Sequence, residues 1–277
     1  TAFNKIQGPA RRIVELFGAL KTVTKRQASE KIASFKNGNK IAFKDVDIFT
    51  PTGNLLVKDL SFEVTGENDS LLLTGHNGAG KSSIFRCLAG LWKIPKGEIT
   101  KPMTPGSTSL SGEVFYLPQK PYNVIGTLTD QLTYPQPAKG AGDLSTQYLT
   151  GILDQVELAY LAERDGAFTE EINWEDALSL GEKQRLAIAR LIHHKPRFAI
   201  LDECTSGVAA SMERSLYLLF NDMGISYITI SHRPVLEQMH CKFLCIKGDS
   251  DKSYEYKVLR NAKQLKAELQ AQQKKLE

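Results

Sequence analysis

Residues 75–83 read GHNGAGKSS and match the spacing G-x-x-x-x-G-K-[ST]. An apolar run, SLLLT, precedes the segment, and a helix-forming run, SIFRCLAGLW, follows it. Glycines let consecutive backbone N–H groups face one set of anionic oxygens, and the start of the following helix adds positive potential. A plain glycine-rich turn needs neither the lysine nor the helix, so the pattern predicts a phosphate-binding loop.

The chemistry of this loop assigns its residues to a nucleoside triphosphate. Lys81 would reach the β- and γ-phosphates, Ser82 the magnesium ion and Ser83 the α-phosphate. His76 most simply fills the loop. The residues that we expect to bind ATP here are Gly75, Asn77, Gly78, Ala79, Gly80, Lys81, Ser82 and Ser83.

The run FAILDE, at residues 198–203, supplies two adjacent carboxylates after an apolar strand. Asp202 is suited to hold Mg²⁺ through water. Glu203 would orient and polarise the attacking water, which is the positioning work that phosphoryl transfer requires. Alone this run carries little information, but after a phosphate-binding loop it predicts a hydrolytic site.

A third segment, LSLGEKQR at residues 178–185, places small polar residues at the start of a predicted helix. Ser179, the Gly181 amide and the helix dipole, with Glu182 beside them, form a second device for binding phosphate. Each chain thus has two phosphate-binding devices for a single nucleotide, and the helical insert would hold the second device away from the chain's own phosphate-binding loop. We therefore expect a head-to-tail dimer in which this segment caps the γ-phosphate bound by the other subunit.

The elements that must position these residues are short apolar strands. SLLLT, FAIL and YITIS are separated by helical material, as are buried parallel strands. Such sheets bind ligands at the carboxyl ends of their strands. Gly75, Asp202 and His232 should therefore meet at one edge.

Flanking segments complete the expected architecture. Residues 6–26 have helical periodicity, KNGNK at 36–40 is typical of a linker, and IAFKDVDIF and LLVKDLSFEV predict two strands around the turn TPTGN. Residues from 122 interrupt the α/β alternation with a helical insert. His193 and His194 lie at the C-terminus of a predicted helix, where positive charge is favourable for the helix dipole. We favour this role for the two histidines over a metal site.

Charge and cysteine content narrow the function further. The net charge of +4 is divided between basic ends, +5 over residues 1–31 and +4 over 257–277, and a central body of −5. An acidic body is a poor platform for nucleic acid. The basic ends suit solvated helix faces, and the first also suits an anionic membrane surface. The four cysteines indicate reduced thiols; Cys241 and Cys245 lack a second pair to hold a metal.

These motifs, in this order, resemble the nucleotide-binding domain of ATP-binding cassette (ABC) transporters over residues 40 to 260. YLPQKPY would be the family's Q-loop and ITISHRP its switch-histidine segment. The resemblance implies an α/β fold: a P-loop NTPase (RecA-like) core, an N-terminal antiparallel β subdomain and an inserted α-helical subdomain. It also implies an ATPase using Mg²⁺, with Glu203, His232 and Gln119 catalytic and Ser82, Gln119 and Asp202 at the metal.

A finer resemblance is to subfamily D, the peroxisomal half-transporters of fatty acids and acyl-CoA. It rests on TPTGN, GKSSIFRCLAGLW, YLPQKPY, LTDQLTYP, GEKQR, ILDECTS and SHRP. It implies a cytosol-facing domain at the peroxisomal membrane, a transmembrane domain upstream or on a separate chain, and a second nucleotide-binding domain. The expected divisions are 1–39 (extension of the last transmembrane helix and linker), 40–256 (nucleotide-binding domain, with 122–190 as helical subdomain) and 257–277 (C-terminal helix).

Three further positions depart from the family pattern. Thr50, beside Phe49, stands where an aromatic residue usually stacks on adenine. Leu180 replaces the first glycine of the usual pair, and Ala209 replaces the aspartate of the loop after the catalytic carboxylates. Thr50 puts adenine recognition in question and Ala209 the communication between the two sites, whereas Gly181, the second glycine of the pair, is kept and function should survive the change at Leu180.

Two alternative functions remain open from the sequence. The chain could be a soluble cassette ATPase acting on ribosomes or DNA, although those usually carry two cassettes or a long coiled coil. It could be a nucleotide-sensing module that does not hydrolyse ATP.

The structure of the C-terminal segment is also open. Its residues that fall at spacings of four and three predict either a short coiled coil or a helix packed on its own domain: Val258, Ala262, Leu265, Leu269, Gln272 and Leu276.

Overall fold

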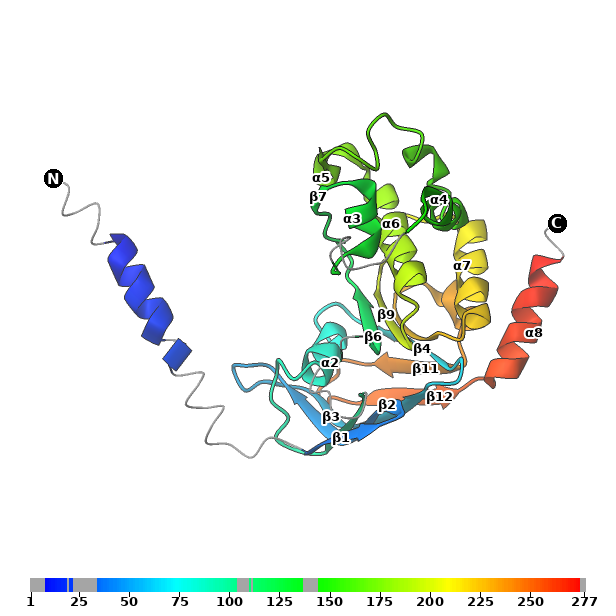
Figure 1. The fold of residues 1–277 in the computed structure, drawn as a ribbon. Helices are drawn as coiled ribbons and strands as arrows, with labels where there is room; N and C mark the ends of the chain where they lie inside the picture. The colour runs from blue at the N-terminus through cyan, green and yellow to red at the C-terminus, as the bar shows by residue number, and fades with distance from the viewer. Residues whose placement is uncertain are drawn as a thin grey trace.

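Six strands form the central sheet of the computed structural model, which describes residues 8–18, 20–21, 34–103, 110, 112–136 and 144–274 (Figure 1). The strand order is β12-β11-β4-β10-β9-β6, and every neighbouring pair is parallel except β11 and β12. The bounds are β4 Ser70–Gly75, β6 Val114–Leu117, β9 Phe198–Asp202, β10 Ser226–Ile230, β11 Lys242–Ile246 and β12 Tyr254–Val258. The expectation that SLLLT, FAIL and YITIS form parallel strands is confirmed.

Both faces of this sheet are covered, which explains its continuous apolar runs. Leu71 and Leu73 of β4 pack into one cluster, with α2 (Lys81–Leu88) and a smaller sheet, whereas Leu72 packs into another cluster with α6 (Leu180–His194) and α7 (Ala210–Asp222). The same alternation separates Ile228 from Tyr227 in β10. The period of two in each strand therefore divides the core into two layers.

The smaller sheet has the order β1-β5-β2-β3. Its strands are β1 Ser34–Gly38, β2 Lys40–Phe49, β3 Leu55–Thr65 and β5 Glu98–Pro102. β2 pairs antiparallel with β3 and with β5, whereas β1 pairs parallel with β5. The two strands expected around TPTGN are thus confirmed as β2 and β3, in a largely antiparallel N-terminal subdomain.

Residues 36–40 are a strand segment and not the linker expected from KNGNK. Residues 36–38 lie in β1, which runs in register with β5 along the sheet edge, and the Lys101 ammonium sits 3.6 Å from the centre of the Phe35 ring. Backbone pairing to a distant strand supplies the order here. Local composition does not record such pairing, which is why the sequence favoured a linker.

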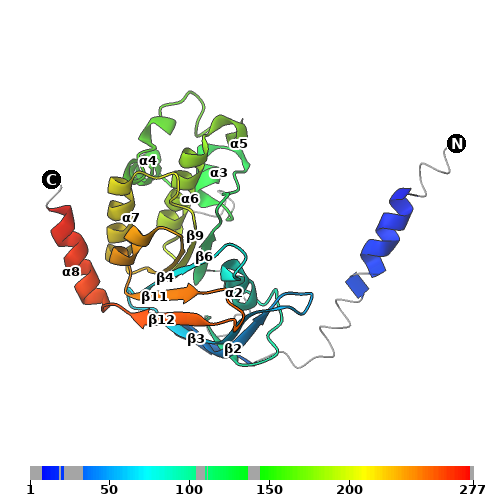
Figure 2. The same cartoon turned by 180° about the vertical axis from the view of Figure 1, so that it is seen from behind.

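A helical subdomain is inserted between β6 and β9 and stands above the sheet in Figures 1 and 2. Its first strand, β7, pairs with β8 in a two-stranded ribbon that the sequence did not predict. The elements are β7 Ile125–Gly126, α3 Leu128–Thr133, α4 Thr146–Gln155, η2 Ala159–Leu161, β8 Ile172–Asn173 and α5 Trp174–Ala177, followed by α6. After β10, the short η3 (Pro234–Met239) leads into β11.

The N-terminal helix spans residues 8–18 and 20–21, within the predicted 6–26. Its apolar side chains are more than half exposed: Ile13, Val14, Leu16, Phe17 and Leu20. None of the described helices is long and apolar enough to cross a membrane.

The C-terminal helix α8 (Ala262–Gln273) packs on its own domain. Leu265 and Leu269 are fully buried in the same cluster as α7, and Val258 belongs to β12 instead of the helix. Two leucines of the face considered for a coiled coil are therefore buried within the chain, which favours the alternative of intramolecular packing. Leu276, which the pattern also used, lies outside the described residues.

This packing predicts a stability effect. Leu269→Ala should lower the free energy of unfolding by about 2–5 kcal/mol, because a fully buried leucine leaves a cavity when truncated. The matched control is Gln270→Ala, which changes an exposed neighbour on the same helix. Urea denaturation of the chain measures both. A loss below about 0.5 kcal/mol for Leu269→Ala would mean that α8 is not held on this domain.

Candidate functional site

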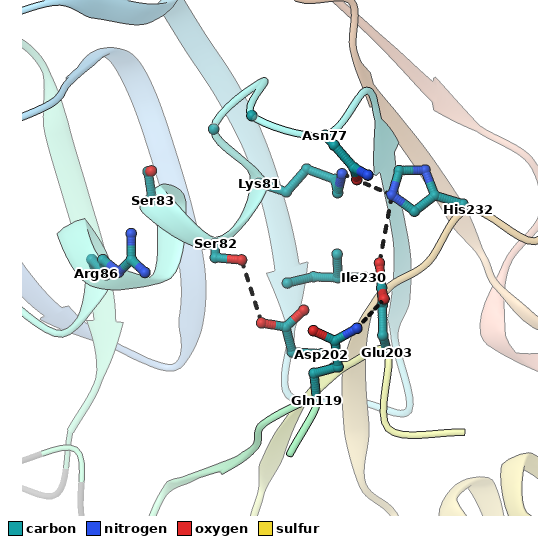
Figure 3. A pocket seen from close by; sticks show the side chains of 12 residues that line it. Asn77, Lys81, Ser82, Ser83, Arg86, Gln119, Asp202, Glu203, Ile230 and His232 are labelled. Carbon is teal, nitrogen blue, oxygen red and sulfur yellow. Dashed lines mark hydrogen bonds and ion pairs between the residues drawn. The ribbon is translucent and has the colours of Figure 1, made fainter. Parts of the chain in front are cut away.

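A cavity of about 530 Å³ opens at the carboxyl edge of the six-stranded sheet (Figure 3). The ends of β4, β9 and β10 meet there, as the sequence predicts for Gly75, Asp202 and His232. The residues that line the cavity are Asn77, Gly78, Gly80, Lys81, Ser82, Ser83, Arg86, Gln119, Asp202, Glu203, Ile230 and His232. All five side chains assigned to hydrolysis or metal binding are among them, whereas Arg86 and Ile230 were not predicted.

The loop after β4 needs glycine at two positions for geometric reasons. Gly75 has φ of 138°, and a Cβ there would lie 2.3 Å from the carbonyl oxygen of Ile246. Gly80 has φ of 108° and precedes α2, which begins at Lys81. These conformations turn the loop backbone toward the cavity and end it at a helix N-terminus, the arrangement that binds phosphate.

Lys81 is buried at the base of the loop. Its ammonium donates to the carbonyl oxygens of Gly75 at 2.7 Å and His76 at 3.2 Å, and it lies 3.1 Å from Nε2 of His232. Burial lowers the pKa of Lys81, and the charges of Glu203 and Asp202 oppose this shift. The ammonium is thus held between the loop and the carboxylates, where a phosphate oxygen would meet it.

The oxygen atoms around Asp202 fit a magnesium ion by their chemistry. Ser82 Oγ donates to Asp202 Oδ2 at 3.3 Å, so the hydroxyl and the carboxylate are adjacent. Gln119 donates through Nε2 to Glu203, which leaves its amide oxygen as a ligand atom. Hydroxyl, carboxylate and amide oxygens are the donors that Mg²⁺ prefers.

Glu203 stands at the centre of the predicted catalytic group. Its carboxylate accepts a hydrogen bond of 2.8 Å from Gln119 and lies 3.5 Å from Nε2 of His232 (Figure 3). Its backbone has φ of 49°, a conformation that costs energy in a residue with a side chain, and its N–H donates to the Ile230 carbonyl at the end of β10. The strained turn aims the carboxylate into the cavity, beside His232.

The segment at the start of α6 does not reach this cavity. Ser179 is the N-cap of α6 and forms a capping box with Glu182, which also accepts a hydrogen bond from the Tyr160 hydroxyl. Hydrogen bonds from Ser179 and Tyr160 lower the pKa of Glu182 to about 2. Ser179 and Leu180 are exposed, and neither they nor Gly181 line the cavity. Of the predicted site residues, Ser179, Gly181 and Glu182 are thus absent from the lining of the cavity that contains Lys81.

Gln184 is a connecting residue that sequence reasoning missed. It is fully buried, donates to the Gln119 carbonyl at 3.5 Å and to Ser206 Oγ at 3.0 Å, and accepts from the Gly207 N–H at 2.8 Å. It thus ties α6 to the loops that carry Gln119 and Glu203. Its signal was a polar residue on the apolar face of a predicted helix, three residues after Gly181 and four before Ile188.

Arg190 anchors α6 to the inserted subdomain. It is almost fully buried and donates to the carbonyl oxygens of Tyr122 and Gln131 and to the side chains of Asn123 and Gln131. Burial lowers its pKa to about 10. Neutral acceptors thus satisfy a buried cation, and this fixes the insert relative to the helix that starts at Leu180.

The positions that depart from the family pattern lie outside the cavity. Thr50 bonds to Thr52 and to the Asn54 N–H in its own turn, and neither it nor Phe49 lines the cavity. Ala209 is the N-cap of α7 and makes no side-chain cap. The structure therefore offers no aromatic ring from residues 49–50 at this site.

A parallel sheet whose central strand runs into a glycine loop and then a helix, with carboxylates at the end of a neighbouring strand, defines the class of P-loop NTPases. Comparison with known proteins narrows this class. The family model described as ABC transporter matches residues 57–206, more than half of the chain. The chain belongs to the ABC transporter family, and this membership indicates ATPase activity.

Relatives support the finer resemblance to subfamily D. The chain is 44% identical to ABC transporter D family member 1 of Arabidopsis thaliana over 92% of this chain and 19% of that protein. It is also 44% identical to ATP-binding cassette sub-family D member 3 of Homo sapiens, over 80% of this chain and 32% of that protein. The chain thus spans less than a third of these relatives, and the recognition of subfamily D is confirmed.

A solved structure confirms the fold class. A bacterial Atm1-family ABC exporter with ATP bound superposes with a TM-score of 0.66 and 22% identity, over 88% of this chain and 44% of that chain. At this identity the similarity concerns the fold alone.

Proposed function

We propose that the chain binds Mg²⁺·ATP and hydrolyses it within a head-to-tail dimer, and that this powers a transporter of long-chain fatty acids or acyl-CoA in the peroxisomal membrane. The observation that carries the ATPase part is the meeting of Lys81, Asp202, Glu203 and His232 at one cavity. A module that only senses nucleotide would not need Glu203 held beside His232.

Each residue of the site has a role that its position supports. Lys81 neutralises the β- and γ-phosphates, and the N–H groups of residues 75–83 bind their oxygens. Mg²⁺, held by Ser82, Gln119 and Asp202, would neutralise phosphate charge. Glu203 orients and polarises the attacking water, and His232, 3.5 Å from that carboxylate, stabilises the charge that develops on the γ-phosphate.

The dimer is proposed because the start of α6 does not line the cavity of its own chain. Ser179 and Leu180 are exposed at the N-terminus of α6, a helix of 15 residues. Its dipole and free N–H groups suit a γ-phosphate, but Gln184 and Arg190 hold α6 in place away from Lys81. A second copy, turned head to tail, supplies Ser179, Gly181 and Glu182 to the first.

Coupling to a transmembrane domain is proposed for the surface between Gln119 and the inserted subdomain. Leu91 is 76% exposed, Ile125 70% and Tyr122 63%. Large apolar side chains at such exposure are typical of a surface that another protein segment covers. The cytosolic loops of the transmembrane domain are the occupant that we propose, so the domain itself would face the cytosol.

The cargo and the organelle rest on the resemblance to subfamily D alone. No residue of this chain is expected to touch the cargo. Its binding would therefore reach the ATPase only as a shift in the closing equilibrium of the dimer.

ATPase assays on the full-length protein reconstituted in vesicles would test the cargo. Acyl-CoA or long-chain fatty acid should raise turnover at least about twofold, whereas an unrelated amphiphile should not. The isolated 277-residue chain should hydrolyse ATP slowly and ignore all three compounds. Gln119→Ala should weaken the stimulation more than it weakens ATP binding, because Gln119 lies between the docking surface and Glu203.

Two results would contradict separate parts of this proposal. Equal responses to the lipids and the unrelated amphiphile would remove the fatty-acyl assignment and leave the ATPase standing. A full-length protein that binds ATP but never hydrolyses it would remove the ATPase.

A further inference from the structure

Asp202 accepts hydrogen bonds from two hydroxyl groups, and only one of them belongs to the phosphate-binding loop. Ser82 Oγ lies 3.3 Å from Oδ2, whereas the Tyr116 hydroxyl lies 2.6 Å from the same oxygen. The shorter bond is thus the one from Tyr116, whose place in the YLPQKPY run gave no indication of this contact. A hydroxyl that donates to a carboxylate at this distance makes a strong, charge-assisted hydrogen bond.

The sheet explains how Tyr116 reaches Asp202. β6 runs parallel to β9 at the edge of the sheet, with Tyr116 opposite Ile200 and Leu117 opposite Leu201. Both strands therefore end at the same edge, and a tyrosine side chain is long enough to reach from one strand to the carboxylate two residues further along the other.

The Tyr116 ring also lines an apolar cavity of about 480 Å³ on the other side of Asp202. Phe85, Leu88, Leu91 and Val114 form much of its wall, and Ser82 and Asp202 border both this cavity and the phosphate site. The ring therefore borders an apolar space while its hydroxyl reaches the carboxylate.

We propose that Tyr116 is a positioning residue for the metal site: its hydroxyl fixes the carboxylate of Asp202 in the orientation that holds the Mg²⁺ of bound ATP. The inference rests on the proposed function, because it concerns the metal that accompanies the nucleotide. Hydrogen bonds to ligating carboxylates orient the ligand, and their loss typically lowers metal affinity by about 10- to 100-fold.

A plain structural role does not account for the contact equally well. Tyr116 is 43% exposed, so its hydroxyl could be hydrated instead of bonding to a charged group. Phenylalanine would place the same ring beside the apolar cavity. The hydroxyl is therefore the part of the side chain whose role needs an explanation, and its bond to Asp202 supplies one.

Tyr116→Phe isolates the hydroxyl and keeps the ring. Titration of the chain with Mn²⁺ in the presence of ADP, followed by electron paramagnetic resonance, measures metal affinity without hydrolysis. Binding of a fluorescent ATP analogue in excess EDTA measures nucleotide affinity without metal. We expect Tyr116→Phe to weaken Mn²⁺ binding about tenfold and to change metal-free nucleotide binding by less than about twofold. The matched control, Tyr148→Phe, removes a hydroxyl at a similar exposure of 38% on α4 and should change neither.

Two outcomes for the variant would overturn the inference. If Mn²⁺ affinity stays within about twofold of the wild-type value, the hydroxyl does not position Asp202. If metal-free nucleotide binding falls as much as Mn²⁺ binding does, Tyr116 supports the loop in general and not the metal ligand. A failure of the proposed function would be seen in the wild-type chain, which would then bind no Mn²⁺ in the presence of nucleotide.

Discussion

Glu203→Gln is expected to lower ATP turnover by at least a hundredfold while ATP affinity stays within about threefold of the wild-type value. Glutamine keeps the shape of the side chain and can still accept the hydrogen bond from Gln119, but it cannot take a proton from water. The strained backbone at φ 49° is the same for both residues. Steady-state ATPase assays and equilibrium ATP binding on the same dimer measure the two quantities.

The comparison variants separate this effect from general damage. Lys81→Ala should lose both binding and turnover, because we propose that Lys81 contacts the phosphates directly. Glu237→Gln changes an exposed glutamate of η3 and should alter neither. Turnover above about a tenth of wild type for Glu203→Gln, a barrier increase under about 1.4 kcal/mol, would refute the general-base assignment.

Ser179→Arg is expected to disable the nucleotide site of the partner subunit and to spare its own. Ser179 is exposed at the N-cap of α6 and lies outside the cavity that contains Lys81. A long cationic side chain there would remove the cap and occupy the space of a γ-phosphate at the dimer interface. Each dimer with one altered signature should therefore occlude one ATP fewer.

Mixed dimers test this arrangement in two ways. When one chain carries Ser179→Arg and the other Lys81→Ala, both lesions fall in one site and one ATP should be occluded. When a single chain carries both changes, each site has one lesion and none should be occluded. Equal occlusion in the two pairings would contradict action between subunits. Ser145→Arg removes the N-cap of α4 in the same manner and should leave occlusion unchanged in either pairing.

Local patterns determined much of this protein. The glycine loop, the apolar strands that end at Gly75 and Asp202, and the helix that starts at Leu180 are predictable because each depends on residues close together in sequence. Parallel strands then bring their carboxyl ends to one edge, so the meeting of Gly75, Asp202 and His232 follows from strand type alone.

Expectations failed where distant partners decide the structure. KNGNK is polar and rich in glycine and asparagine, yet pairing with β5 makes residues 36–38 part of a strand. The spacing of leucines in α8 suits a coiled coil and an intramolecular helix equally, and only the position of α7 decides between them. Periodicity shows which face of an element is buried, but it does not show what covers that face.

The sequence by itself thus determined the class of protein, the order of its motifs and most of the residues at the phosphate site, because these are encoded in short segments. Only the tertiary structure decided which polar side chains join those segments: Gln184 links α6 to the loops of Gln119 and Glu203, and Tyr116 reaches Asp202 from a neighbouring strand. These contacts depend on strand register and helix packing between residues far apart in the chain. The local sequence does not show which of these residues come into contact.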